Sequence, residues 1–291
     1  MAYFNYNGKI HKAGSTVIGV SNRGLRYGDG LFETIKCING QLVMPDEHFS
    51  RLWKGMSILD FEIPRHFTPT GLEEEIISLA MKNSHEKAAR IRLTVIRGDG
   101  GLYDAVSLAP NYIIETWALP ESNGNALNSN GLVLGIYHQV KKNAGILSNL
   151  KHNNYLHAVM ASIHAKKNKW NDAILLNSEG SVCESTIANV FVVKNGSVYT
   201  PSLDEGCVAG VMRKAVLKHL LSNSQSTEII DITEKQVTLD DLMQADEVFL
   251  TNSIYDIRWV QSIEEKKYGN AITQQIHHSL IHHFNDKVII S

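Results

Sequence analysis

The most informative stretch of this 291-residue chain lies between residues 150 and 191. It opens with Leu150-Lys151-His152-x-Asn154-Tyr155 and continues as a helix-like run followed by a short apolar strand. Glu184 then comes at the end of a second strand-like run, among small polar residues. A lysine just ahead of a helix and a glutamate at a strand end predict that the chain folds around a chemical site here.

The two side chains have complementary chemistry toward an aldehyde cofactor. A lysine amine can form a Schiff base with pyridoxal 5'-phosphate, and a carboxylate can pair with the protonated pyridine nitrogen of that group. Two residues alone are weak grounds, because most lysines and glutamates are solvated surface charges. The hypothesis therefore depends on the motifs around them.

Six ordered motifs surround this pair. They lie at residues 27–34 (Tyr-Gly-Asp-Gly-Leu-Phe-Glu-Thr), 150–154, 184–191, 199–201 (Tyr-Thr-Pro), 210–213 (Gly-Val-Met-Arg) and 245–249 (Ala-Asp-Glu-Val-Phe). Together they resemble the fold-type IV pyridoxal-phosphate enzymes, which include branched-chain and D-amino-acid aminotransferases and 4-amino-4-deoxychorismate lyase. The resemblance implies an α+β, two-domain fold: a small antiparallel α+β domain and a larger β-barrel-like domain with helices. It also implies pyridoxal 5'-phosphate as cofactor, a small-molecule amino substrate and a homodimer.

Composition describes an ordinary soluble protein, with 43% hydrophobic and 20% charged residues. The formal net charge of -2 and the lack of a dense basic stripe argue against a nucleic-acid partner. The sequence has no run of about 18 apolar residues, so no membrane-spanning helix is predicted. The chain opens without a basic segment followed by an apolar run, and its three cysteines, Cys37, Cys183 and Cys207, are too scattered for a disulfide framework or zinc site. We expect a cytoplasmic protein with no membrane partner.

The length permits two domains. The polar segment 120–131, rich in Asn, Ser and Gly, is predicted to link a small N-terminal α+β domain at 1–119 to a large cofactor-binding domain at 132–291. Asn-Gly pairs predict hairpin turns at 7–8, 39–40 and 195–196. Periodicity predicts helices at 46–59, 154–167, 210–221 and 272–284, and a capping box at Thr70–Glu73 predicts the start of one more. Strands are predicted at 31–38, 41–44, 90–97, 112–119, 132–138, 173–176, 190–193, 198–200 and 246–251.

The resemblance assigns the two central roles. Lys151 occupies the position of the lysine that carries the cofactor, and this residue must later be released as an amine that moves a proton. Glu184 occupies the position that pairs with the pyridine nitrogen. A carboxylate there keeps that nitrogen protonated, so the ring can accept the electrons left when a proton departs.

The cofactor phosphate requires hydrogen-bond donors, and the start of a helix provides them. The backbone N–H groups of Val211 and Met212 are therefore candidates. The resemblance adds further cofactor-binding candidates: Arg51 in His48-x-x-Arg51, Ser253 in Thr251-Asn252-Ser253, Ile187 through its backbone, and Tyr155 for the phenolic oxygen of the cofactor. Without the resemblance, Arg51 would be interpreted as a helix-surface arginine.

Substrate recognition is expected from the N-terminal domain. Arg97, which precedes Gly98-Asp99-Gly100-Gly101, is a candidate carboxylate clamp, with a solvated charge at a strand end as the alternative. The resemblance places Tyr27 in the lining of the active site. It places Thr34 at a hydroxyl position that lies near the substrate in the lyase.

Four histidines lie near the C-terminus, at positions 277, 278, 282 and 283. His278 and His282 are four residues apart, which could place two metal ligands on one helical face. No carboxylate or cysteine cluster accompanies them, so we expect a solvated histidine face and no metal.

The choice of reaction rests on finer differences. Gly210-Val211-Met212-Arg213 stands where the aminotransferases usually have Gly-Ile-Thr-Arg, and methionine at that point is common among the lyases. The motifs at 150–154, 199–204 and 97–101 also look more like the lyase. The sequence thus favours 4-amino-4-deoxychorismate lyase, which supplies folate synthesis. A branched-chain or D-amino-acid aminotransferase and a non-catalytic protein that binds pyridoxal phosphate remain alternatives.

Overall fold

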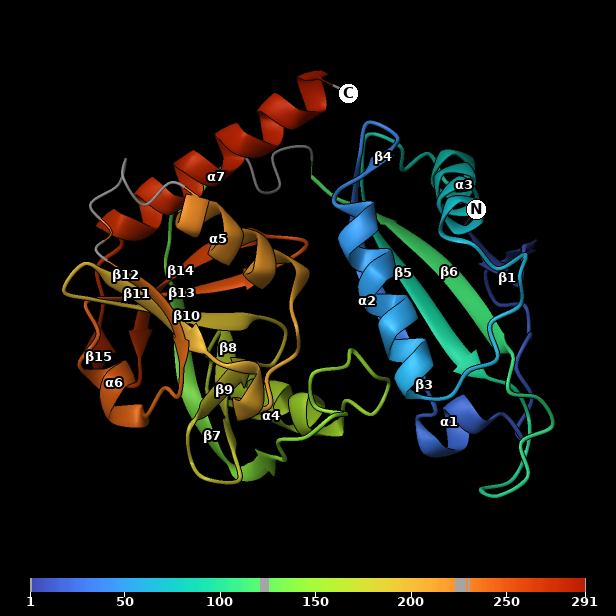
Figure 1. Cartoon of the computed structure of the whole chain (residues 1–291), viewed down its shortest axis with the longest axis horizontal. Helices are drawn as coiled ribbons and strands as arrows, with labels where there is room; N and C mark the ends of the chain where they lie inside the picture. The colour runs from blue at the N-terminus through green and yellow to red at the C-terminus, as the bar shows by residue number, and fades with distance from the viewer. Residues whose placement is uncertain (1, 121–125, 223–228, 230, 291) are drawn as a thin grey trace. The chain divides into compact units, whose positions relative to one another are not determined.

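The computed structural model describes residues 2–120, 126–222, 229 and 231–290, with side chains described as far as residue 281. The chain forms two compact units (Figure 1). The first comprises Met1–Asn123 together with Leu150–Asn154, and the second comprises Gly124–Asn149 together with Tyr155–Ser291. The lysine motif therefore groups with the N-terminal part of the chain, although it follows that part by many residues.

The first unit is built on a six-stranded antiparallel sheet in the order β2-β1-β6-β5-β3-β4. Positive-φ residues at Asn7–Gly8 and Asn39–Gly40 form the two predicted hairpin turns. The strands are β1 (Tyr3–Tyr6), β2 (Lys9–Lys12), β3 (Gly30–Ile38), β4 (Gln41–Leu42), β5 (Ala88–Arg97) and β6 (Pro110–Ala118).

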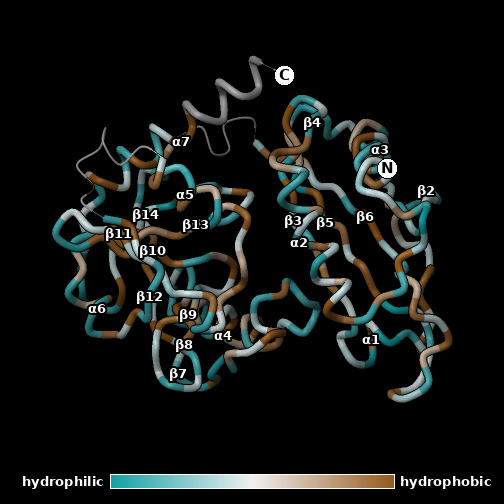
Figure 2. The backbone as a smooth tube through the Cα atoms, in the orientation of Figure 1, coloured by the Kyte–Doolittle hydropathy of each residue, from teal (hydrophilic) through white to brown (hydrophobic). Residues whose placement is uncertain are grey.

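Helices α2 (Pro45–Ile58) and α3 (Pro69–Lys82) cover one face of this sheet, and the short α1 (Arg23–Tyr27) precedes β3 (Figure 1). Alternate strand residues supply the core beneath the helices, among them Ile35 and Leu93, both fully buried. Figure 2 shows apolar and polar residues interspersed along α2 and the strands of this unit. The predicted capping box at Thr70 is wrong, because the hydroxyl of Thr68 caps α3 by accepting from Gly71 N.

The second unit is built on a nine-stranded mixed sheet in the order β12-β11-β10-β13-β14-β7-β8-β9, with β15 on β14. Parallel pairs join β7 to β8, β7 to β14 and β11 to β12, and the other pairs are antiparallel. The strands are β7 (Leu132–Lys142), β8 (Asp172–Asn177), β9 (Val182–Ser185), β10 (Asn189–Lys194), β11 (Ser197–Pro201), β12 (Asp231–Lys235), β13 (Glu247–Asn252), β14 (Asp256–Ile263) and β15 (Lys266–Lys267).

The helices of the second unit are α4 (Leu156–Lys167), α5 (Val211–Ser222), α6 (Leu239–Met243) and α7 (Ala271–Ile290), with a 3-10 turn η1 at Leu203–Glu205. The small residues Ala158, Ala161 and Ala165 let α4 pack closely on β7 and β8. The predicted helices at 46–59, 154–167 and 210–221 are confirmed to within two residues. Strand β7 extends four residues beyond the prediction, to Lys142, which pairs with Asn177 of β8.

Further expectations concern the C-terminal histidines, the cysteines and membrane-spanning helices. His277 is buried, so the expected solvated histidine face is wrong for this residue, whereas His278 is exposed. The side chains of residues 282 and 283 lie outside the described part of the chain. The three cysteines are buried free thiols. Among the described residues, none of the helices has the length and apolar character needed to cross a membrane.

Candidate active site

Backbone hydrogen bonds fix the lysine segment against the start of β3. Phe32 N donates to Lys151 O at 2.8 Å, and Asn153 N donates to Gly30 O at 2.9 Å. Gly30 permits this approach, because a Cβ there would lie 2.3 Å from Val95 O and 2.6 Å from Asn153 Nδ2. The position of Lys151 is therefore set by main-chain pairing within the first unit.

The side chain of Lys151 lies over Phe32, with its ammonium 4.5 Å from the ring centroid. Strand alternation places Phe32 and Thr34 on the sheet face opposite α2, since Ile35 packs beneath that helix. The guanidinium of Arg92, the β5 partner of Thr34, lies 3.9 Å over the same ring. This face thus combines an amine, a hydroxyl and a guanidinium, of which the sequence analysis missed Arg92.

On the helix-covered face, Arg51 of α2 is held by Glu33 of β3. Arg51 Nε donates to Glu33 Oε1 at 2.8 Å, and Arg51 Nη2 donates to Oε2 at 2.5 Å. His48 Nδ1 lies 2.7 Å from Glu33 Oε2. The alternative interpretation of Arg51 as a surface arginine is wrong, since its side chain is only 13% exposed.

The charges of this cluster follow from burial and pairing. Burial by itself raises the pKa of Glu33, but the Arg51 charge and the hydrogen bonds from His48 and Arg51 outweigh it and lower the pKa to about 2. Burial lowers the pKa of His48, and the charges of Arg51 and Lys151 add to this effect against the influence of Glu33. A neutral His48 can then donate through Nδ1 to an ionised Glu33, which fixes the guanidinium.

Arg97 lies on the sheet face opposite the one that carries Thr34. It ends β5 on the helix-covered face, where Nη2 donates to Leu59 O and Nε lies 3.4 Å from Asp29 Oδ2. The solvated-charge alternative is wrong, because Arg97 is buried. Tyr27 lies at the end of α1 and is exposed; the following Gly28 lies against the backbone of Asn154, so Tyr27 is close to the lysine segment.

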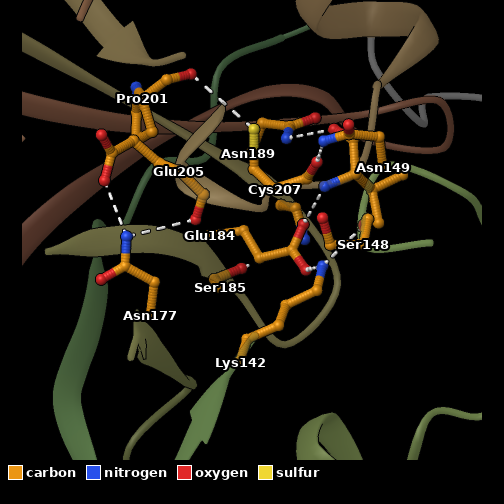
Figure 3. Close-up of polar contacts among 12 residues, drawn as sticks. Lys142, Ser148, Asn149, Asn177, Glu184, Ser185, Asn189, Pro201, Glu205 and Cys207 are labelled. Atoms are coloured by element: carbon orange, nitrogen blue, oxygen red, sulfur yellow. Dashed lines mark hydrogen bonds and ion pairs between the residues drawn. The ribbon is translucent and has the colours of Figure 1, made fainter. Parts of the chain in front are cut away.

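In the second unit, Glu184 lies on β9 and is 3% exposed. Its Oε1 lies 2.5 Å from Lys142 Nζ (Figure 3). Its Oε2 accepts from Val208 N at 2.8 Å. Lys142, the last residue of β7, also donates to Ser148 O at 3.1 Å. The sequence analysis missed Lys142, since the prediction ended that strand before it.

The candidate phosphate-binding groups of this unit gather at one end of β10 and β13. Asn189 at the start of β10 pairs with Thr251 near the end of β13, so the preceding Ile187 and the following Ser253 lie at the same strand ends. Gly210, which precedes α5, lies against Asn189, where a Cβ would be 1.9 Å from Oδ1. The first turn of α5 is thereby brought to the same place.

These groups differ in what they can offer. The side chains of Val211 and Met212 are buried, so they contribute backbone N–H groups that have no partner within the first turn of a helix. Ile187 is 55% exposed, and it likewise can contribute only its backbone. Tyr155 adjoins the N-terminus of α4, half-buried and packed against the core beneath that helix.

The residues of each unit, taken separately, fit pyridoxal 5'-phosphate. The hydroxyl of Thr251 is buried and has no hydrogen-bond partner among the described residues, so a polar group is available where the candidate phosphate donors meet. The Glu184 carboxylate uses two of its roughly four lone-pair sites on Lys142 and Val208 and can accept from a pyridine N–H as well. Lys151 supplies the amine.

Comparison with known proteins agrees with this chemistry. A family model described as amino-transferase class IV matches residues 30–263. The chain is 32% identical to an aminodeoxychorismate lyase of Vibrio harveyi over 251 residues, which cover 85% of this chain and 88% of that protein. It is 27% identical to a D-alanine aminotransferase of Bacillus licheniformis over 266 residues, covering 91% and 90% of the two chains.

Solved structures share the fold. A crystal structure of a branched-chain aminotransferase from Thermoproteus uzoniensis matches with a TM-score of 0.85 and 23% identity, over 98% of this chain and 95% of that chain. At this identity the likeness shows the fold alone. The expected α+β fold, with a small antiparallel sheet and a larger curled sheet flanked by helices, is confirmed.

Proposed function

Because this chain belongs to the class IV aminotransferase family, we propose that it is a 4-amino-4-deoxychorismate lyase, which yields 4-aminobenzoate and pyruvate for folate synthesis. The family is dependent on pyridoxal 5'-phosphate, so the predicted cofactor is confirmed. The observation that carries the lyase proposal is Met212, whose buried side chain replaces the threonine usual in the aminotransferases. Similarity to the Vibrio lyase supports the same choice.

When bound, the cofactor supplies an electron sink next to the amino nitrogen of the substrate. Lys151 is proposed to take the proton from the carbon that bears this nitrogen. Loss of that proton, followed by cleavage of the carbon–oxygen bond to the enolpyruvyl group, makes the six-membered ring aromatic. The departing enolpyruvate takes up a proton on carbon and leaves as pyruvate, so no oxidant, reductant or amino acceptor is consumed.

The neighbouring residues then have defined tasks. Glu184 places a negative charge against the ring nitrogen and so favours its protonated form. Thr34 lies on the same sheet face as Phe32, over which Lys151 lies, and its hydroxyl can donate to the departing oxygen. Arg51, held by Glu33, is proposed to bind the phosphate together with Ser253 and the backbone at 187 and 211–212.

An aminotransferase acting on branched-chain or D-amino acids is the second candidate, favoured by similarity to the Bacillus D-alanine aminotransferase. The two activities differ in their need for an acceptor. A lyase returns to its starting form after each cycle, whereas an aminotransferase that receives only an amino donor stops after one half-reaction, with the cofactor left as pyridoxamine phosphate.

The test is incubation with 4-amino-4-deoxychorismate without a keto acid, while pyruvate and 4-aminobenzoate are counted per active site. Parallel reactions contain L-leucine or D-alanine, each with and without 2-oxoglutarate. The proposal requires many turnovers on the first substrate alone. Rapid amino transfer without 4-aminobenzoate would establish the aminotransferase, and no reaction with any substrate would favour a non-catalytic binding protein.

We further propose that the protein is a cytoplasmic homodimer. Helix α4 exposes an apolar stripe at helical spacing on the side opposite its buried alanines: Leu156, Val159, Met160 and Ile163, each at least 42% exposed. A second copy is the proposed cover for this stripe. Three buried free thiols are typical of a reducing compartment.

A further inference from the structure

Lys142 and Glu184 form a buried ion pair in the second unit, and backbone groups of Ser148 and Val208 hold it in place. Lys142 at the end of β7 is 6% exposed, and its ammonium lies 2.5 Å from Glu184 Oε1 on β9. The carbonyl of Ser148 accepts from the same ammonium (Figure 3). The N–H of Val208 donates to the other carboxylate oxygen. Glu184 is therefore fixed by a positive charge on one oxygen and a backbone donor on the other.

The negative charge of Glu184 is balanced by Lys142 and not by the other groups around it. Burial raises the pKa of the Cys183 thiol, and burial likewise raises that of Cys207 to about 12, so both thiols are neutral near pH 7. Glu205 accepts from Asn177 Nδ2, and Arg213 donates to Pro201 O and Glu234. A buried carboxylate without a paired cation takes up a proton in preference to remaining charged.

We propose that Lys142 is a positioning residue that keeps Glu184 ionised and aimed, so that the site presents a carboxylate when the pyridine nitrogen of the cofactor arrives. This inference rests on the proposed role of Glu184. Its consequence is a count of protons. If Glu184 is ionised beforehand, the pyridine nitrogen, which is already protonated in free pyridoxal 5'-phosphate at pH 6, pairs with it and no proton is released. If Glu184 is already protonated, the site then holds one proton too many, and that proton is released to solvent on binding.

Two measurements on the full-length protein test this proposal. The first compares urea midpoints of wild type, Lys142→Met, Glu184→Gln and the double variant, with the exposed neighbour Lys141→Met as a matched control. We predict that Lys142→Met lowers the midpoint, that adding Glu184→Gln recovers part of the loss, and that the control has no effect. Strictly additive effects would overturn the proposal, as would failure of both Lys142 variants to fold.

The second measurement is the net proton uptake on binding of pyridoxal 5'-phosphate at pH 6, counted as negative when protons are released, and obtained by calorimetry in two buffers of different ionisation enthalpy. Lys142→Arg should match wild type, whereas Lys142→Met should take up fewer protons, by as much as one, and approach Glu184→Gln. Wild-type uptake by Lys142→Met together with reduced uptake by Glu184→Gln would leave Lys142 a merely structural partner. Wild-type uptake by Glu184→Gln would instead refute the proposed role of Glu184, while the urea comparison would still report the pair itself.

Discussion

Arg51 and Glu33 form a two-pronged ion pair between α2 and β3, with nitrogen–oxygen distances of 2.8 and 2.5 Å. The planar guanidinium fork matches the two carboxylate oxygens, which holds it more rigidly than a single contact would. The pair thus has two expected effects: it stabilises the first unit, and it orients Arg51, a candidate phosphate ligand. The two effects can be measured separately.

The stability effect should depend on pH. The pKa of Glu33 is lowered from 4.5 to about 2, so its ion pair stabilises the folded state fully above pH 4.5 and loses that effect as the pH falls toward 2. The shift corresponds to about 3 kcal/mol at most. In urea unfolding at several pH values, the difference between wild type and Glu33→Gln should shrink below pH 4.5. A difference that stays constant down to pH 3, or an equal effect of the exposed control Glu62→Gln, would contradict this.

The orienting effect should appear in cofactor binding. Arg51→Met is expected to weaken binding of pyridoxal 5'-phosphate about tenfold or more, since a charge-assisted hydrogen bond contributes about 1.5–3 kcal/mol. Binding of pyridoxal, which lacks the phosphate, should change little. Titrations of both compounds into wild type, Arg51→Met and the exposed control Arg65→Met provide the comparison. Equal losses for both compounds would show that Arg51 acts through the fold and not on the phosphate.

Arg92 and Arg97 should have different roles, because they lie on opposite faces of the first sheet. Arg92 shares a face with Thr34, so Arg92→Met should raise the KM for a carboxylate substrate about tenfold or more and leave the urea midpoint near wild type. Arg97→Met removes the partner of Leu59 O and Asp29 and should lower the midpoint. Steady-state kinetics and urea unfolding of both variants decide the matter. The opposite outcome would make Arg97 the carboxylate clamp.

The exposed stripe on α4 should hold two copies together. Met160→Glu places a charge in that stripe, whereas the exposed Lys166→Glu lies outside it and serves as control. Light scattering during size-exclusion chromatography should find a dimer for wild type and control and a monomer for Met160→Glu. A Met160→Glu dimer of unchanged stability would exclude this stripe from the interface.

Local patterns in the sequence predicted much of the fold. Apolar residues at helical spacing defined α2, and Asn-Gly pairs marked the tight turns, because both signals lie within a few neighbouring residues. The sequence pattern favoured Thr70 over Thr68 as the cap of α3, since the two threonines lie only two residues apart, one just before the helix and one in its first turn. Such errors at element ends arise where two nearby residues can satisfy the same unpaired N–H groups.

The site could be predicted only as far as its motifs extend. Lys151 and Glu184 lie in recognisable motifs, but Lys142 lies in the polar end of β7, which has no regular alternation, and its partner is 42 residues away. Arg92 reaches the face of Thr34 through the pairing register of β3 and β5, which the sequence does not state. Contacts between distant segments depend on strand register, and a slip of one residue would reverse the faces.

The central claim is that Lys151, and not the buried Lys142, carries the cofactor. The most direct test is borohydride reduction of the protein loaded with pyridoxal 5'-phosphate, which makes the lysine–cofactor bond permanent, followed by peptide mapping by mass spectrometry. We predict loss of the visible absorption and one pyridoxyl group on Lys151, with none in Lys151→Ala. A pyridoxyl group on Lys142, or on any lysine other than Lys151, would contradict it.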